Sequence, residues 1–321
     1  MKLGVFTVLF GERSFTEMLA EVRQLGLEAI ELGTGAYPGN SHCNAERLLA
    51  DRQLLDKYKR EVEDSGLFIS ALACQGNPLH PDARIAAQHQ DTFEKTVLLA
   101  QQLQVPVVNL LSGCPGEPGG GNYPNWPGFA WPPEYLELWE WQWNEVAIPY
   151  WKEAARFAND HGIFKLAIEM HPGFLVYNPE TALRLRAAVG ETIGVNFDPS
   201  HLFWLNIDLP SAIEALAGCI FHCHAKDVSL NRRQMDVNGL LDRKPYSAIA
   251  KRSWNFRAPG WGHGAETWKQ IVSALRVHGY DYVLSIEHED PFTSAQEGLC
   301  YSVDFLQGLL LRERPGPMWW A

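Results

Sequence analysis

The sequence predicts an α/β fold, a single (β/α)₈ barrel (a TIM barrel) over residues 1–321, with long loops after the fourth and seventh strands. The length of 321 residues suits one barrel with insertions. Hydrophobic residues make up 46% of the chain and supply a large core, and short β-rich runs alternate with helical patterns throughout. A doubly wound open sheet is the alternative, but its first turn often carries a glycine fingerprint, and here Gly11 stands alone.

Eight short runs have the composition and length of strands. The first, close to the N-terminus, is too short for the apolar region of a signal peptide and is better explained as a strand. The predicted strands are Leu3–Phe10, Ala29–Leu32, Phe68–Leu72, Val107–Leu111, Lys165–Met170, Ile193–Asp198, Ile220–Lys226 and Tyr282–His288.

A helical pattern follows each of these strands. After the first strand, Met18, Leu19 and Val22 recur at helical spacing, and Gly26 is a natural helix stop. Gly66, Gly162 and Gly279 stop later helices in the same way. The predicted helices are Thr16–Leu25, Ala45–Ser65, Ala83–Leu103, Asn144–His161, Pro179–Val189, Pro210–Leu216, Glu266–His278 and Glu297–Arg312.

Two connections, Ser112–Trp143 and Arg232–Gly264, are too long for simple turns. Both follow strands, so in a barrel they lie on the C-terminal face, where long ordered loops cover or shape a site. Disorder or an oligomer contact is the alternative, and five tryptophans in the first loop argue against disorder. We therefore expect a lid or pocket wall there, and we expect the tail at Trp319–Trp320 to dock, for example on a neighbouring subunit.

Charge and composition limit the partners. Asp and Glu outnumber Lys and Arg by 38 to 27, a net charge of −11 that repels phosphate backbones, so nucleic-acid binding is not expected. No run of 18 apolar residues exists, so we expect no membrane span. The six cysteines are scattered, and Cys219 and Cys223 lack the CxxC spacing of a structural zinc site, which favours reduced thiols and a cytoplasmic location.

The last four predicted strands each end in acidic residues or histidines. Because side chains alternate along a strand, the polar residues of each end share one face, which points to the barrel axis. We expect four such sets to converge at the barrel mouth. The motifs are Ile168–Pro172 (IEMHP), Asn196–His201 (NFDPSH), His224–Asp227 (HAKD) and Ile286–Asp290 (IEHED).

Three carboxylates and an imidazole would repel or desolvate one another at high cost unless a cation neutralised them. One divalent cation solves this, and the mixed oxygen and nitrogen set suits Mn²⁺, Co²⁺, Mg²⁺ or Zn²⁺. The alternative is that each acid pairs with its own Lys or Arg. The predicted metal-binding residues are Glu169, Asp198, His224 and Glu287.

Together the four motifs resemble the sugar phosphate isomerase/epimerase family of xylose isomerase-like TIM barrels, whose relatives include ketose 3-epimerases, inosose dehydratase and endonuclease IV. The resemblance implies one divalent ion, with Mn²⁺ favoured, on the four residues above. It also implies that Glu169 and Glu287 shuttle a proton and that His201, in an Asp-x-x-His match, contacts substrate. The endonuclease branch carries three zinc ions and many more histidine ligands, which this acidic chain does not match.

Further candidates surround this set. His171 shares a face with Glu169 and is a second candidate base, or it binds a sugar hydroxyl. Lys226 is a candidate for binding a hydroxyl or phosphate, or it pairs with a neighbouring acid. Arg257 and His263, on the second long loop, and His80, after the third strand, are candidate substrate contacts; surface or turn roles are the alternative for the two histidines.

The predicted activity is that of a metal-dependent sugar isomerase or epimerase, which takes a proton next to the carbonyl of a keto-sugar through a metal-stabilised enediolate. One alternative is a lyase, a C-glycoside deglycosidase catalytic subunit that cleaves a 3-keto-glycoside by elimination with a small partner subunit. The other is a non-catalytic sugar-binding barrel. The expected partners are therefore a small sugar or keto-glycoside and further subunits in a homo-oligomer, or a hetero-oligomer with a small subunit.

Overall fold

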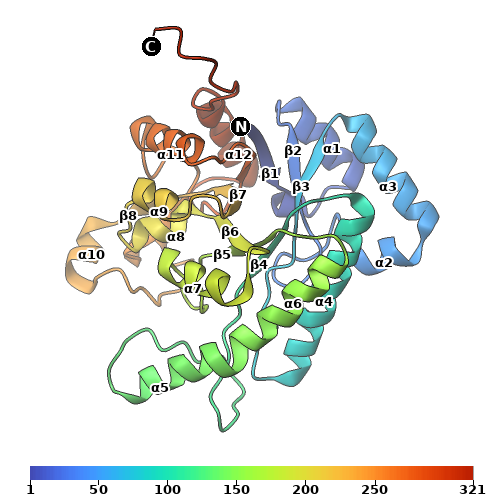
Figure 1. The fold of residues 1–321 in the computed structure, drawn as a ribbon. Helices are drawn as coiled ribbons and strands as arrows, with labels where there is room; N and C mark the ends of the chain where they lie inside the picture. Colours follow the sequence, from blue (N-terminus) through green and yellow to red (C-terminus); the bar gives the residue numbers. More distant parts are fainter. Residues whose placement is uncertain (321) are drawn as a thin grey trace.

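A computed structural model describes residues 1–320 and contains a closed barrel of parallel strands in the order β1-β10-β7-β6-β5-β4-β3-β2 (Figure 1). Pairing of β1 with β10 closes the barrel, with Lys2 opposite Val283. The predicted barrel is therefore confirmed over the open sheet. The barrel strands are β1 (Lys2–Phe6), β2 (Ala29–Gly33), β3 (Phe68–Ala73), β4 (Val108–Leu111), β5 (Leu166–Glu169), β6 (Ile193–Phe197), β7 (Ile220–Ala225) and β10 (Val283–Ile286).

Helices surround this barrel, and most of them bury an apolar stripe against it (Figure 1). In the first helix, Ser14 and Glu17 form a reciprocal capping box, which fixes where the helix begins. The helices are α1 (Phe15–Gln24), α2 (Ala45–Ala50), α3 (Arg52–Ser65), α4 (Ala83–Leu103), α5 (Glu134–Trp141), α6 (Ile148–Asp160), α7 (Pro179–Val189), α8 (Pro199–Trp204), α9 (Leu209–Ala215), α10 (Arg232–Asn238), α11 (Ala265–Val277) and α12 (Ala295–Gln307). Of these, α5 and α10 have no buried residue.

Two predicted elements are wrong in extent near the N-terminus. The first strand ends at Phe6, and Thr7–Phe10 forms a turn of 3₁₀-helix. A short apolar run does not distinguish these conformations by its pattern alone. The predicted helix Ala45–Ser65 is two helices, because Asp51 is extended (φ −127°, ψ 103°) and its carboxylate accepts hydrogen bonds from the first turn of α3.

We expect Asp51→Ala to lower the free energy of unfolding by about 1 kcal/mol, because it removes this N-cap. The carboxylate accepts from Gln53 N at 2.9 Å and Leu54 N at 3.0 Å, and both donors would lose their partner. Urea unfolding measures the change, and Glu63→Ala, an exposed change on the same helix, is the control. Equal losses in the two variants would contradict the capping role.

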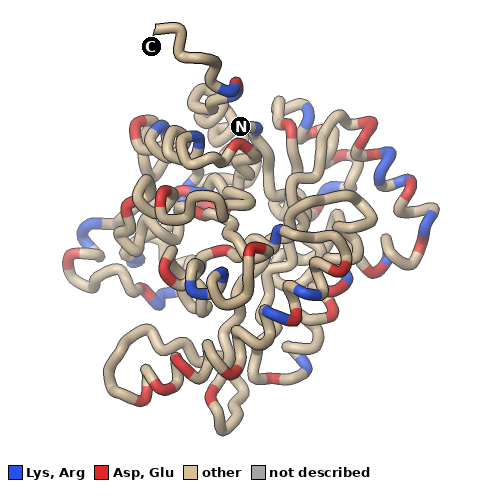
Figure 2. Tube along the Cα trace, viewed as in Figure 1, with Lys and Arg blue, Asp and Glu red and all other residues tan. Residues whose placement is uncertain are grey.

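The first long loop is partly helical. α5 continues through a π-helical turn, Gln142–Ala147, into α6, so the helix begins ten residues before the predicted start at Asn144. The last part of the predicted loop, residues 134–143, is therefore helix. Figure 1 shows α5 projecting from the barrel, and Figure 2 shows acidic but no basic residues on this arm, as the sequence from Cys114 to Trp151 requires. Its charge has the wrong sign for a phosphate backbone.

The second long loop contains a small antiparallel sheet, β8 (Asp227–Leu230) with β9 (Trp254–Arg257), and α10 lies between the two strands in sequence. Trp204, Val228 and Trp254 belong to a separate apolar cluster beneath it. This framework fixes the loop over the C-terminal face. In the tail, Trp319 is 89% exposed and does not dock on the part of the chain described here, so its docking on a neighbouring subunit stays a prediction.

The barrel interior is unusually polar. TIM barrels usually fill the interior with branched apolar side chains, but here Asn109, Asn196 and His222 are fully buried. The Nδ1 atom of His222 lies 3.1 Å from Asn109 Nδ2 and 3.2 Å from Asn196 Oδ1. On the other side of the ring, His222 Nε2 lies within hydrogen-bond distance of Ser70 Oγ, at 3.1 Å. This network lies below the strand ends and supports the side chains at the mouth. Within residues 1–320, no helix is long and apolar enough to cross a membrane.

Candidate active site

The structure brings the four predicted metal-binding residues together at the carboxyl ends of β5, β6, β7 and β10. His224 Nδ1 lies 3.0 Å from Glu287 Oε2 and 3.6 Å from Glu169 Oε2. Ligand atoms of Asp198, His224 and Glu287 all lie within 4.8 Å of one another, and all four side chains are buried. The four strand ends therefore converge at the barrel mouth, as side-chain alternation predicts.

One lysine forms ion pairs with three of the surrounding carboxylates. Lys226 Nζ lies 2.6 Å from Glu287 Oε2, 3.1 Å from Asp198 Oδ2 and 3.1 Å from Glu289 Oε2. Burial opposes its charge, but these carboxylates raise the pKa of Lys226 well above its usual value. The alternative, in which each acid has its own basic partner, therefore does not describe this site.

The Asp-Pro-Ser-His segment is built by the start of α8. Pro199 occupies the first turn, and the Asp198 carboxylate caps the helix by accepting from Ser200 N at 2.8 Å. His201, one turn on, then places Nε2 3.2 Å from Asp198 Oδ2 and 3.3 Å from Glu169 Oε1. Nε2 makes no hydrogen bond of good geometry within residues 1–320, so a buried polar atom faces the site without a partner.

Two histidines are held neutral beside the acids. Burial lowers the pKa of His201 to about 4 and that of His171 to about 4. The His171 Nδ1–H donates to the carbonyl oxygen of Pro172 at 2.6 Å, and its ring centroid lies 4.1 Å from that of His201. His201 therefore presents an imidazole nitrogen to Glu169, and the His171 ring packs beside it.

Glu31, which was not among the predicted site residues, reaches the same site from β2. It is fully buried, accepts from Asn109 Nδ2 at 2.7 Å and Ser285 Oγ at 2.8 Å, and lies 3.0 Å from His224 Nε2. Burial alone would raise its pKa, but His224 and His222 lower it to about 2. The available signal was a single acid inside the otherwise apolar run Ala29–Gly33.

Two amides were also missed as supports for Glu169. Gln75 Nε2 and Asn196 Nδ2 both donate to Glu169 Oε2, at 3.2 Å and 3.1 Å. Gln75 follows β3 and Asn196 lies in β6, so they approach the carboxylate from different strands. Glu169 is thereby oriented at the mouth by neutral donors.

Three predicted substrate contacts lie elsewhere. Arg257 Nε donates to Asp290 Oδ2 at 2.9 Å, and His263 Nδ1 lies 2.7 Å from Asp227 Oδ1. These pairs tie the second long loop to the barrel. His80 Nδ1 accepts from the backbone of Asp82 at 3.0 Å, as a turn histidine does. None of the three lines the two cavities beside the site.

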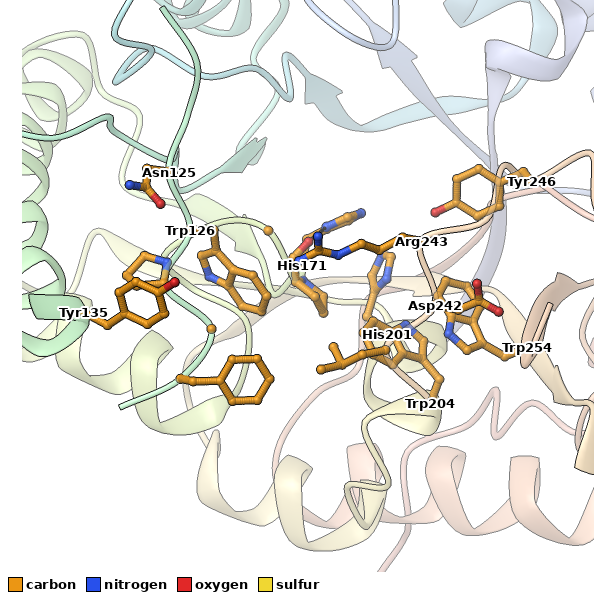
Figure 3. A pocket seen from close by; sticks show the side chains of 16 residues that line it. Asn125, Trp126, Tyr135, His171, His201, Trp204, Asp242, Arg243, Tyr246 and Trp254 are labelled. Atoms are coloured by element: carbon orange, nitrogen blue, oxygen red, sulfur yellow. Dashed lines mark hydrogen bonds between the residues drawn. The ribbon is translucent and has the colours of Figure 1, made fainter. Parts of the chain in front are cut away.

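A cavity of about 530 Å³ opens over His171 and His201, within the range of small-molecule sites. Figure 3 shows Trp126 and Tyr135 on one side of it and Tyr246 on the other. A second cavity of about 330 Å³ shares His171 and Tyr246 with the first and reaches Glu289. The convergent acids therefore lie beside a two-part cavity, which the sequence indicated only as a pocket wall.

Residues 19–306 match the family described as xylose isomerase-like TIM barrel. The chain belongs to the xylose isomerase-like TIM barrel family. The uncharacterized protein YfiH of Bacillus subtilis (strain 168) is 38% identical over 309 residues, which cover 96% of this chain and 98% of that protein. The family predicted from the strand-end motifs is confirmed.

Solved structures with the family fold align with nearly the whole chain. The probable 3-DHS dehydratase AsbF from Bacillus anthracis aligns with a TM-score of 0.69 at 17% identity, covering 96% of this chain and 99% of that one. A D-psicose 3-epimerase in the presence of D-fructose gives 0.63 at 16% identity, covering 96% and 98%. A xylose isomerase-like protein from Mycobacterium smegmatis in complex with magnesium gives 0.62 at 17%, covering 97% and 98%. At sequence identities of 16–17%, this structural similarity establishes the fold alone.

In this member of the xylose isomerase-like family, the residues fit a divalent cation. Glu31, Glu169, Asp198 and Glu287 are buried together, and the lysine among them is already shared. Burial opposes a charge on His224, yet Glu31 and Glu287 raise its pKa well above the usual value. The site thus carries an excess of negative charge, and its oxygen and imidazole donors match a hard or borderline cation.

Proposed function

We propose that this chain is a divalent-metal-dependent sugar isomerase or epimerase acting on a keto-sugar. The observation that carries the proposal is the convergence of Glu169 and Glu287 with Asp198 and His224 beside a cavity of sugar size. Membership of a family whose solved relatives include ketose epimerases supports the same reaction class.

Glu169, Asp198, His224 and Glu287 would hold one divalent ion, with Mn²⁺ favoured over Co²⁺, Mg²⁺ and Zn²⁺. When bound, such an ion polarises the substrate carbonyl and stabilises the negative charge that develops on its oxygen. Lys226 contacts two of these carboxylates, and Glu289 Oε2, at 3.1 Å, would remain a partner for its ammonium if the ion were bound.

Glu169 and Glu287 are the proposed acid and base. One carboxylate takes the proton from the carbon next to the carbonyl, and the electron pair of the broken C–H bond moves to the carbonyl carbon and its oxygen. Return of a proton to the opposite face gives epimerisation, and return to the neighbouring carbon gives isomerisation. His171, His201 and Lys226 are the proposed contacts of substrate hydroxyls.

Incubation of ketoses in D₂O tests this proposal. We expect the wild-type protein to exchange the proton next to the carbonyl, to lose this activity after chelation and dialysis, and to regain it with Mn²⁺. Circular dichroism should remain unchanged, because the barrel core does not depend on the ion. Exchange that is unaffected by chelation, or no exchange with any ketose or 3-keto-glycoside, would contradict the proposal.

A lyase reaction is the second candidate, favoured by the aromatic cavity wall at Trp126, Trp204 and Trp254, which suits a flat substituent on the sugar. The same base would take the proton, and the substituent would leave from the next carbon with the electron pair of its bond. Release of that substituent from a 3-keto-glycoside, with a small partner subunit, would identify the lyase. Light scattering would establish whether copies of the chain or a small subunit assemble with it. Either catalysed proton exchange or catalysed release of the substituent would exclude a purely sugar-binding role.

A further inference from the structure

A cation without an anionic partner faces the larger cavity. Arg243 lies on the second long loop, and Figure 3 shows its side chain extending across the cavity toward His171. Within residues 1–320, no carboxylate oxygen lies within 4.0 Å of its guanidinium and no hydrogen bond holds it. The five donors of this group are therefore available to a ligand.

Three other cations near the site are already paired with carboxylates, and buried Arg252 donates to backbone carbonyl oxygens. Lys226 serves three carboxylates, and Arg257 is paired with Asp290. Lys244 lies next to Arg243 in sequence, but its Nζ lies 3.0 Å from Asp242. That same Asp242 carboxylate also accepts from Ser253 N at 2.6 Å, so its charge is satisfied without Arg243.

The surroundings of Arg243 favour an extended ligand. Trp126 and Tyr135 form the facing wall, and Tyr246 separates this cavity from the smaller one that reaches Glu289. A ligand whose sugar carbons lie at the acids beside His171 and His201 would therefore have aromatic faces around it and the guanidinium within reach of its other end. Arg forms paired, charge-assisted hydrogen bonds with carboxylate and phosphate oxygens.

We propose that the substrate carries an oxyanion, a carboxylate or a phosphate ester, and that Arg243 selects for it. The inference rests on the proposed function, because it places the sugar at the neighbouring acids. Arg243 is a specificity-determining residue here: it contacts the charged end of the substrate and takes no part in moving the proton.

Three ketoses that differ at one carbon test the selection. D-Fructose, D-fructuronate and D-fructose 6-phosphate are titrated against the full chain with Mn²⁺ and again with chelator, and tryptophan fluorescence reports binding. We expect at least one of the two anions to bind about tenfold or more tightly than fructose, because a charge-assisted pair is added. The tighter of the two anions identifies the source of the oxyanion.

Arg243→Gln should remove this preference and leave the affinity for fructose unchanged. Arg233→Gln, an exposed change on α10, removes the same charge away from the cavity and is the matched control. Equal binding of all three ketoses, binding of none, or equal losses in the two variants would overturn the proposal. Failure of the proposed reaction is separable, because it would abolish exchange in D₂O while leaving the anion preference in these titrations.

Discussion

Glu287→Gln is expected to lower the rate of proton exchange in a ketose by about 10²–10⁴-fold, the usual contribution of a positioned acid or base. Its Oε2 lies 3.0 Å from His224 Nδ1 and 2.6 Å from Lys226 Nζ, so the carboxylate lies at the centre of the convergent group. Glutamine keeps the size of the side chain and one oxygen, but its amide does not accept the substrate proton. Exchange followed by NMR in D₂O measures the effect.

Glu289→Gln is the matched control. Glu289 also contacts Lys226, at 3.1 Å, but its side chain is half exposed and lies at the edge of the smaller cavity. We expect a modest change in this variant. Element analysis of both variants separates loss of a base from loss of the ion, and a Glu287→Gln protein with full metal content and wild-type exchange would remove Glu287 from the mechanism.

The sequence predicts the barrel well because its signals are local. Alternation of short strands with helices needs only neighbours in the chain, and glycine stops such as Gly66, with φ 71°, mark helix ends directly. Side-chain alternation then places Glu169, Asp198 and His224 on the inner face. The helix break at Asp51 was missed because a helical pattern continues across it, although an aspartate N-cap is visible in the sequence.

Residues that depend on barrel closure were not predictable in the same way. Glu31 meets His224 across 193 positions of sequence, and Gln75 meets Glu169 across 94. Similarly, Arg257 is paired with Asp290 and His263 with Asp227. Only the folded loop brings these partners within reach. Residue type alone therefore identified groups able to bind substrate without showing which of them already had partners.

Glu31→Ala is expected to destabilise the fold by about 3–5 kcal/mol, the usual cost of removing one member of a buried charged pair. The carboxylate is fully buried and lies within hydrogen-bond distance of Asn109, Ser285 and His224, so its loss would remove a buried acceptor from all three and leave His224 with Glu287 alone to balance its charge. Urea unfolding measures the change. Ser285→Ala removes one hydrogen bond to the same carboxylate and should cost only about 1 kcal/mol.

The milder Glu31→Gln variant separates stability from function. Glutamine can still accept from Ser285 or Asn109, so the protein should remain folded, but its amide accepts a weaker hydrogen bond from His224 than a carboxylate does and orients the ring less firmly. Groups that hold a metal-binding histidine in this way affect metal affinity by about 10–100-fold. We therefore expect weaker Mn²⁺ binding by calorimetry in Glu31→Gln, with little change in Ser285→Ala. Wild-type Mn²⁺ affinity in Glu31→Gln, or a Glu31→Ala protein as stable as Ser285→Ala, would show that the polar barrel interior does not support the site above it.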